Sequence, residues 1–161
     1  MGVSGSGKSA VGALLAERLG ARYFDADPLH PGENIAKMRR GEPLTDADRA
    51  PWLDAVGRTL ADAPPIAIVG CSALKRAYRD RIRQRVGAPV VFVHLSGSRD
   101  LIAIRMRGRS GHFMPLSLLD SQFAALEPPS ADEHAVTVDI DRPLAEIVAL
   151  IAQTFGKEQA A

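Results

Sequence analysis

Residues 2–9 read G-V-S-G-S-G-K-S and match the pattern G-x-x-x-x-G-K-[ST] of a phosphate-binding loop. The glycines remove Cβ atoms that would keep phosphate oxygens away from backbone N–H groups. In this pattern the lysine reaches the β- and γ-phosphates, and the last hydroxyl binds Mg²⁺. The positive end of the following helix faces the same point. The motif therefore requires a loop that leads into a helix, and it predicts a nucleotide-phosphate site at Gly2, Val3, Ser4, Gly5, Ser6, Gly7, Lys8 and Ser9.

A phosphate loop normally follows a buried strand, yet only Met1 precedes Gly2 here. Two interpretations are open: the true start lies upstream, or residues 1–3 are a stub of that strand. We expect a handful of apolar residues upstream of Met1, with residues 1–3 as the end of a central strand. Met1, Gly2 and Ser6 also fit an N-myristoylation pattern. Because the phosphate loop already explains Gly2 and Ser6, we interpret that match as a by-product.

Size and composition favour one ordinary globular domain over residues 1–161. Twenty basic residues balance nineteen acidic ones, so the charge gives no reason to expect a nucleic-acid partner. Cys71 is the single cysteine, which excludes an intrachain disulfide and a cysteine-rich zinc lid. The apolar runs are too short to span a membrane, and the N-terminus has no secretory signal. We therefore expect a cytoplasmic protein without a membrane partner.

Helical and strand patterns alternate along the chain, which predicts an α/β domain with a mostly parallel sheet. Short apolar runs rich in β-branched residues predict the strands. Apolar residues at helical spacing, together with caps such as Thr45, predict the helices. The expected strands are 22–24, 66–69, 90–95 and 135–140. The expected helices are 8–19, 34–40, one from Thr45 through Leu60, 75–86, 100–107, 115–126 and 143–155, before a frayed tail at 156–161.

Ligands of a parallel sheet bind beyond the carboxyl ends of its strands, and Asp25 and Asp27 follow the second strand. While the backbone stays extended, residues two apart point the same way. One carboxylate could bind Mg²⁺ through water, and the other could accept the proton of an attacking hydroxyl. The alternative is that both are turn residues before Pro28.

The third strand runs into residues 70–75 without an acidic residue, so a Walker-B aspartate is missing there. Mg²⁺ would then depend on Ser9, phosphate oxygens, water and Asp25. Ser72 could bind substrate or cap the next helix. Most of the basic residues that follow must be solvated, but Lys75 and Arg79 lie one helical turn apart and could share a face towards the site.

Arginines and glycines alternate near residues 105–115 and predict a lid that closes over phosphates. Arg105 and Arg109 would share a helix face, and their guanidinium groups would stabilise charge on a transferring phosphoryl group. A solvated basic loop is the alternative. The loop histidines His30 and His112 have no partner at metal-ligand spacing, so zinc is not expected.

Several segments together resemble the gluconate kinase (gluconokinase) family of small P-loop carbohydrate kinases. The resemblance covers most of the chain and rests on residues 2–9, D-A-D-P-L-H-P (25–31), N-I-A-K-M (34–38), G-E-P-L-T-D-A-D-R-A-P-W-L (41–53), C-S-A-L-K-R-A-Y-R-D (71–80), R-x-x-x-R-x-G-H-F (105–113) and V-D-I-D-R-P-L (138–144). It implies a P-loop kinase fold, a parallel sheet of order 2-3-1-4-5 with helices on both faces, and commonly a homodimer. It also implies ATP- and Mg²⁺-dependent phosphorylation of D-gluconate to 6-phospho-D-gluconate.

The resemblance further implies roles for single residues. Lys8 and Ser9 would act on phosphate and Mg²⁺, and Asp27 would be the base. Arg105 and Arg109 would take the lid positions, with Arg109 catalytic. Gluconate contacts would come from Asp27, His30, Arg49, Lys75 and Arg79. The chain departs from the family at Ala26, where glycine is common, and in the short first strand.

Two rival functions remain open at this stage. A kinase resembling shikimate kinase would also need an arginine for an acid substrate and an aspartate base, although segments 41–53 and 71–80 favour gluconate. A non-catalytic nucleotide-binding protein is the second rival. The intact Lys8, Ser9 and Asp27 argue against it, whereas the short N-terminus argues for it.

Overall fold

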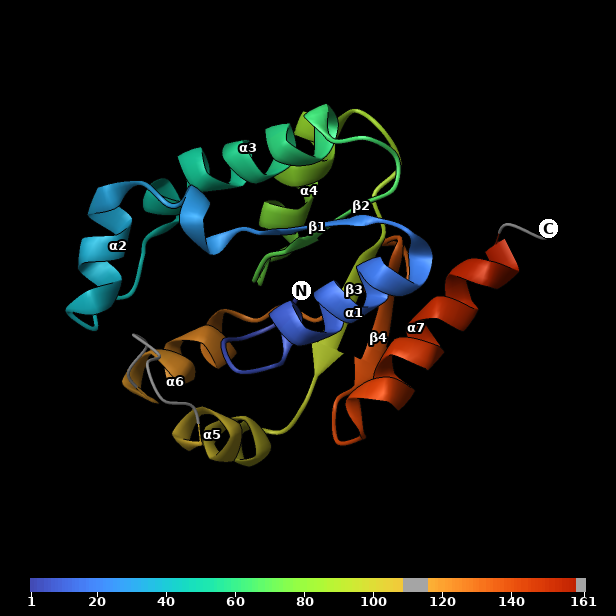
Figure 1. Ribbon diagram of the computed structural model, residues 1–161. Coiled ribbons are helices and arrows are strands. Elements are labelled where there is room, and N and C mark those ends of the chain that lie inside the picture. Colours follow the sequence, from blue (N-terminus) through green and yellow to red (C-terminus); the bar gives the residue numbers. More distant parts are fainter. Residues whose placement is uncertain (109–115, 159–161) are drawn as a thin grey trace.

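The computed structural model of the chain describes residues 1–108 and 116–158 (Figure 1). Helices and strands alternate through the described residues, as expected for an α/β domain. The elements are α1 (Lys8–Leu19), β1 (Arg22–Asp25), the 3₁₀ turn η1 (Asp27–Leu29), α2 (Gly32–Arg39), α3 (Asp46–Asp62), β2 (Ala67–Gly70), α4 (Arg76–Val86), β3 (Phe92–Ser96), α5 (Arg99–Arg107), α6 (Leu116–Ala125), β4 (Ala135–Asp139) and α7 (Leu144–Glu158).

The predicted elements are found with small shifts at their ends. The segment after β1, predicted as a loop, is the 3₁₀ turn η1. Residues 156–158 continue α7 where a frayed tail was expected, and the rest of that tail lies outside the described residues. The predicted cap at Thr45 is confirmed: its side chain accepts the N–H of Asp48, and the Asp48 carboxylate accepts the N–H of Thr45.

The strands form two parallel pairs, β1 with β2 and β3 with β4. Residues 1–2 lie between the pairs and bind both of them. The Met1 amino group donates to the Val93 carbonyl, and the Met1 carbonyl accepts the Leu95 N–H at 2.9 Å. On the other side, the Gly2 N–H donates to the Ser72 carbonyl at 3.1 Å. The order across the molecule is therefore β1, β2, residues 1–2, β3, β4. This is the predicted order 2-3-1-4-5 when residues 1–2 are counted as strand one, but the strands form two separate two-stranded sheets and not the expected single sheet.

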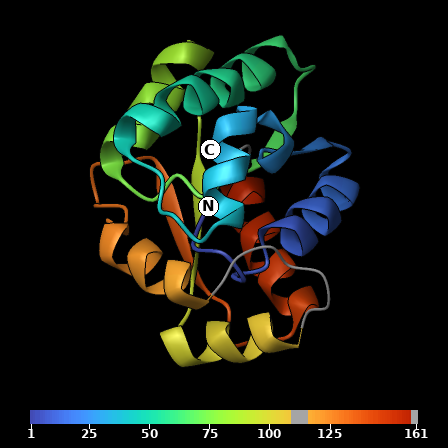
Figure 2. The same ribbon diagram turned by 90° about the vertical axis from the view of Figure 1, so that its left-hand side faces the viewer.

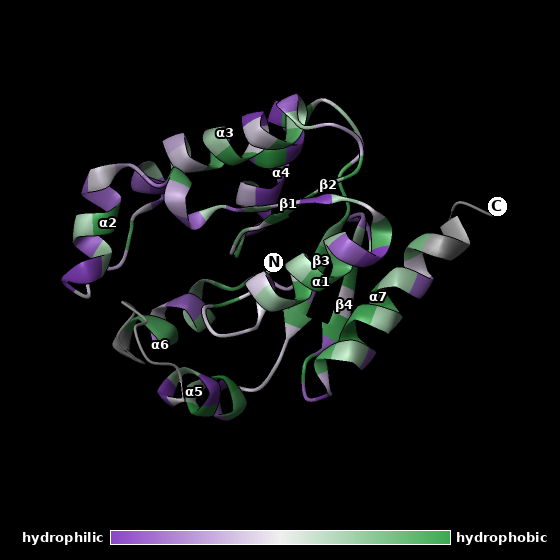
Figure 3. Cartoon of the chain, viewed as in Figure 1, coloured by the Kyte–Doolittle hydropathy of each residue, from purple (hydrophilic) through white to green (hydrophobic). Residues whose placement is uncertain are grey.

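Helices cover both faces of the strands (Figures 1 and 2). Helix α1 packs against α7, β1 and β2, while α3 packs against α4 and β2. One hydrophobic core forms around α1, β3, β4 and α7 and includes Leu15 and Ile151. A second core forms around α3 and α4, with Trp52 and Ile82 fully buried. Figure 3 shows apolar residues along β3 and α7. None of the helices in the described ranges is long and apolar enough to cross a membrane.

Candidate active site

The phosphate loop turns from residues 1–2 into α1 through three glycines with left-handed φ angles: Gly2 (142°), Gly5 (79°) and Gly7 (95°). Two of them are also closely packed. A Cβ on Gly2 would lie 2.9 Å from the Leu95 carbonyl oxygen, and one on Gly5 would lie 2.7 Å from Cγ of Met106 in α5. Backbone conformation and packing therefore both require glycine at these two positions.

Lys8 is the first residue of α1, and its side chain folds back over the phosphate loop that precedes the helix. Its Nζ donates to the carbonyl oxygens of Gly2 (3.0 Å) and Val3 (2.9 Å). These contacts hold the ammonium group above the loop, where the motif places the β- and γ-phosphates. Ser9 is the next residue of α1; it is exposed and lies in the first turn, at the positive end of the helix. The roles of Lys8 and Ser9 towards phosphate and Mg²⁺ stay predictions.

Asp25 and Asp27 are separated by the structure rather than paired. Ala26 adopts a helical conformation (φ −80°, ψ −18°), so the extended backbone that would align the two carboxylates is absent. Oδ1 of Asp25 accepts the Asp27 N–H at 3.0 Å, which makes Asp25 a turn residue. Asp27 instead lines a pocket together with Lys8. The structure thus supports a site role for Asp27, and it does not bring Asp25 into the pocket.

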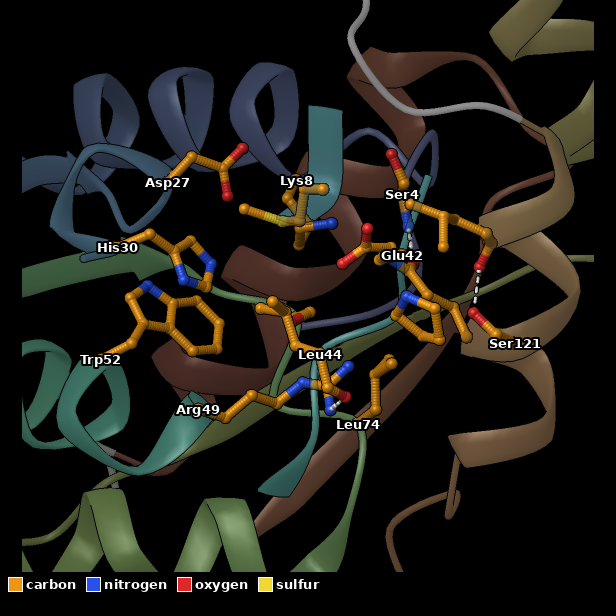
Figure 4. A pocket seen from close by; sticks show the side chains of 15 residues that line it. Ser4, Lys8, Asp27, His30, Glu42, Leu44, Arg49, Trp52, Leu74 and Ser121 are labelled. Carbon is orange, nitrogen blue, oxygen red and sulfur yellow. Dashed lines mark hydrogen bonds between the residues drawn. The ribbon is translucent and has the colours of Figure 1, made fainter. Parts of the chain in front are cut away.

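This pocket opens beside the phosphate loop, between η1, α3 and α6 (Figure 4). The loop contributes Ser4 and Lys8, and the segment before α3 contributes residues 42–44. Figure 4 shows Asp27 and Lys8 on one side and Arg49 on the other, with His30 and Trp52 between them. The complete lining is Ser4, Lys8, Asp27, His30, Met38, Glu42, Pro43, Leu44, Arg49, Trp52, Ser72, Leu74, Leu118, Ser121 and Gln122.

His30 and Trp52 form one flat wall of the pocket. Their rings stack with centroids 4.1 Å apart and an interplanar angle of 11°. The Trp52 indole N–H donates to the Ala26 carbonyl at 2.8 Å, which ties α3 to the turn that carries Asp27. Burial, and then the positive charge of Arg49, lower the pKa of His30 to about 4. The imidazole is therefore neutral at neutral pH and can both donate and accept hydrogen bonds.

Arg49 is the arginine that lines the pocket. Its Nη1 donates to the Leu44 carbonyl, and the group lies 5.6 Å from the centre of the Tyr78 ring. These contacts fix the side chain against the pocket wall. A planar guanidinium held in place suits a carboxylate, which it can bind through two parallel hydrogen bonds.

Lys75 and Arg79 do not share a face towards the pocket. Lys75 precedes α4 in an extended conformation (φ −92°, ψ 151°), so the argument from helical spacing fails. Its Nζ binds the Asp46 carboxylate at 2.9 Å. Neither side chain is among the pocket-lining residues.

Arg79 is fully buried and acts as a structural clamp. It binds both carboxylate oxygens of Glu133 at 2.6 and 2.7 Å. Its Nη1 donates to the carbonyls of Ala73 (3.2 Å), Leu74 (3.1 Å) and Glu127 (3.0 Å). The guanidinium therefore joins the segment after β2 to the segment before β4, and the expected gluconate contact at Arg79 is wrong for this arrangement.

The structure describes the first residues of the predicted lid, 105–108. Arg105 is in α5, and its Nη2 donates to the Ile140 carbonyl at 2.7 Å, which anchors α5 to the end of β4. Arg109 and the rest of the predicted lid to residue 115 lie outside the described residues, as does His112. Their expected roles stay predictions.

Two further observations complete the site. Ser72 lines the pocket, whereas Lys75 occupies the cap position of α4, so Ser72 is not the helix cap. Gln122 of α6 accepts the Ser4 N–H at 2.6 Å and thus binds the phosphate loop. Sequence reasoning missed Gln122, because a glutamine on an ordinary helix gives no signal.

In residues 1–108 and 116–158, no group of three His, Cys, Asp or Glu side chains could hold a metal ion by itself.

Comparison with known proteins agrees with this geometry. A family profile described as shikimate kinase matches residues 4–122. A probable gluconokinase of Mus musculus is 45% identical, with 96% of this chain and 95% of the relative covered. The thermoresistant gluconokinase of Escherichia coli (strain K12) is also 45% identical, with 98% and 91% covered.

Solved structures give the same result at the level of the backbone. The crystal structure of a gluconokinase from Sinorhizobium meliloti 1021 superimposes with a TM-score of 0.85 at 48% identity, over 98% of this chain and 94% of that one. The similarity thus extends over nearly the full length of the chain. The chain belongs to the gluconokinase family, within the P-loop kinase fold that the shikimate kinase profile also describes.

Proposed function

We propose that the protein transfers the γ-phosphoryl group of ATP to the 6-hydroxyl of D-gluconate and releases ADP and 6-phospho-D-gluconate. The observation that carries the proposal is the arrangement of the pocket. It brings Lys8, Asp27 and Arg49 around one cavity at the end of the phosphate loop. A cation for the phosphates, a carboxylate and a guanidinium for an acid substrate are the groups that this transfer needs.

In the proposed reaction the 6-hydroxyl oxygen forms a bond to the γ-phosphorus while the bond from that phosphorus to the β,γ-bridging oxygen breaks. Asp27 accepts the hydroxyl proton, and Lys8 stabilises the negative charge on the phosphates. The oxygen donor of Ser9 is the ligand type that Mg²⁺ prefers, and a bound Mg²⁺ would neutralise phosphate charge at that end of α1. Arg109 would add positive charge from the lid, and Arg105 would join it only after leaving the Ile140 carbonyl.

The substrate is held by the opposite side of the pocket. Arg49 binds the gluconate carboxylate. The 6-hydroxyl, at the opposite end of the substrate, then lies near Asp27. The neutral imidazole of His30 hydrogen-bonds the substrate hydroxyls. The flat His30–Trp52 wall supports the apolar edge of the sugar acid. Lys75 reaches the substrate only if it leaves Asp46. The resemblance also implies a homodimer, which sedimentation of the protein would test.

A kinase for shikimate is the second candidate, because a shikimate kinase profile matches residues 4–122. One assay separates the candidates: ADP release with ATP and Mg²⁺, and either D-gluconate, shikimate or no acceptor. Release that depends on D-gluconate alone supports the proposal. Release that depends on shikimate assigns the second activity. ATP binding without acceptor-dependent release would assign a non-catalytic nucleotide-binding role.

A further inference from the structure

One nitrogen of the Arg49 guanidinium binds the neighbouring protein. This nitrogen, Nη1, donates to the Leu44 carbonyl (Figure 4) and, at 3.4 Å, to the Tyr78 hydroxyl. The two bonds use both Nη1 hydrogens. Within residues 1–108 and 116–158, the Nε and Nη2 groups have no hydrogen-bond partner, and the side chain lines the pocket. The Nε–Nη2 edge is therefore the edge that a ligand in the pocket can bind.

Tyr78 makes the second of these bonds and is itself fixed by Asp46. The Tyr78 side chain is buried, and Cζ of Arg49 lies over its ring, 5.6 Å from the ring centre. The Tyr78 hydroxyl donates to Oδ1 of Asp46, which is the first residue of α3. Because the single hydrogen of this hydroxyl points to the carboxylate, its oxygen presents lone pairs to the guanidinium.

The charges around Tyr78 maintain this direction of hydrogen bonding. Nζ of Lys75 binds both Asp46 carboxylate oxygens at 2.9 Å, and this bond, followed by the one from Tyr78, lowers the pKa of Asp46. Burial, and then the bond to Asp46, raise the pKa of Tyr78, so the phenol keeps its proton at neutral pH. A hydrogen bond from a phenol to an ionised carboxylate is one of the stronger kinds. The Tyr78 oxygen is therefore held in place to accept from Arg49.

We propose that Tyr78, supported by Asp46, is a positioning residue that turns the Nε–Nη2 edge of Arg49 into the pocket to bind the substrate carboxylate through two parallel hydrogen bonds. This inference rests on the proposed function. A guanidinium binds a carboxylate in this way only when two of its N–H groups face both oxygens in one plane. Tyr78 and Asp46 are not among the pocket-lining residues, so they act through Arg49.

The first test is Tyr78→Phe, which keeps the ring and removes only the oxygen that Arg49 binds. We expect the KM for D-gluconate to rise about 3–10-fold, because one hydrogen bond that orients the guanidinium is lost. The kcat and the KM for ATP should stay within about twofold, because an orienting bond of this kind acts on substrate binding and not on the phosphoryl group.

A double-mutant cycle shows whether Asp46 acts through Tyr78. Asp46→Ala should raise the KM for D-gluconate about 2–5-fold in the wild-type background. In the Tyr78→Phe background it should add nothing, because the oxygen that it holds is already gone. The matched control is Asp54→Ala in the same helix. Asp54 binds Arg81 and Arg85 outside the pocket, so the KM for D-gluconate should stay within about twofold.

Nuclear magnetic resonance of the arginine Nε–H groups tests the edge without an activity measurement. The Arg49 signal is identified by its absence from Arg49→Lys. Saturating D-gluconate should move this signal in the wild type, because the Nε–H gains a carboxylate partner. A signal that stays in place would overturn the proposed edge, even where a variant fails to fold.

The outcomes separate this inference from the proposed function. Gluconate-dependent ADP release by the wild type, together with an unchanged KM in Tyr78→Phe, would overturn the inference alone. Additive effects of Tyr78→Phe and Asp46→Ala would overturn the link between them, and a lowered kcat with an unchanged KM would overturn the positioning role. A wild type that releases no ADP with D-gluconate would overturn the proposed function and, with it, the inference.

Discussion

We expect the buried ion pair between Arg79 and Glu133 to stabilise the fold and to contribute little to catalysis. Replacing Glu133 with glutamine leaves the Arg79 guanidinium buried without an opposite charge, since both side chains are almost completely inaccessible (0% and 2% exposed). Removing one partner of such a pair typically costs about 3–5 kcal/mol. For a domain of this size, that corresponds to a Tm lowered by about 6–20 °C. The KM for gluconate of the folded variant should stay within about twofold of the wild type.

Matched variants make this test specific. Arg76→Ala removes the exposed pair with Asp132 and should lower the Tm by only about 0–4 °C, because exposed pairs contribute about 0–1 kcal/mol. The double variant Arg79→Met/Glu133→Leu should recover only part of the loss, because no charge is left buried but three backbone carbonyls lose the Arg79 donor. Thermal unfolding measures all of these. A Glu133→Gln variant with an unchanged Tm, or an Arg79→Met/Glu133→Leu variant whose KM rises tenfold or more, would refute the clamp and restore Arg79 to the substrate site.

The remaining predictions concern the pocket. Asp27→Asn should lower kcat by about 10²–10⁴-fold, the usual range for a lost general base, and an unchanged kcat with a raised KM would assign Asp27 to binding instead. Arg49→Ala should mainly raise the KM for gluconate, whereas Lys75→Ala should change it little, because Lys75 binds Asp46 outside the pocket; kinetics with the opposite pattern would exchange their roles. The pKa of His30 is lowered to about 4, so between pH 6.5 and 4 the unfolded state binds more protons than the native state. The free energy of unfolding therefore decreases as the pH is lowered through this window. Melting curves should show a smaller loss over this window in His30→Gln, and an identical loss would contradict that environment.

The phosphate loop and the alternating elements could be predicted because each rests on local chemistry, whereas the sheet order was implied by the resemblance to the gluconate kinase family. The glycine spacing determines the loop. Alternation of short apolar runs with helical patterns determines the parallel sheet. The position of Asp27 at a strand end predicts its place near the loop, and the structure confirms that it lines the pocket.

The errors came from tertiary contacts and from local backbone conformation. Helical spacing suggested that Lys75 and Arg79 share a face, but Lys75 lies before the helix and Arg79 turns inwards to Glu133, 54 residues away in sequence. Asp25 would be equivalent to Asp27 only with an extended backbone between them, whereas Ala26 is helical. Gln122 binds the phosphate loop from a distant helix, a contact that no local pattern encodes.

Gluconate-dependent ADP release by the wild type and by Lys8→Ala tests the central claim most directly. The proposed function predicts release that requires ATP, Mg²⁺ and D-gluconate together. It also predicts that Lys8→Ala removes most of this activity, because the phosphates lose their nearest cation. The matched control is Lys37→Ala, whose Nζ binds Asp48 outside the pocket and which should keep most of the activity. Full activity in Lys8→Ala, or release that is the same without gluconate, would contradict the claim.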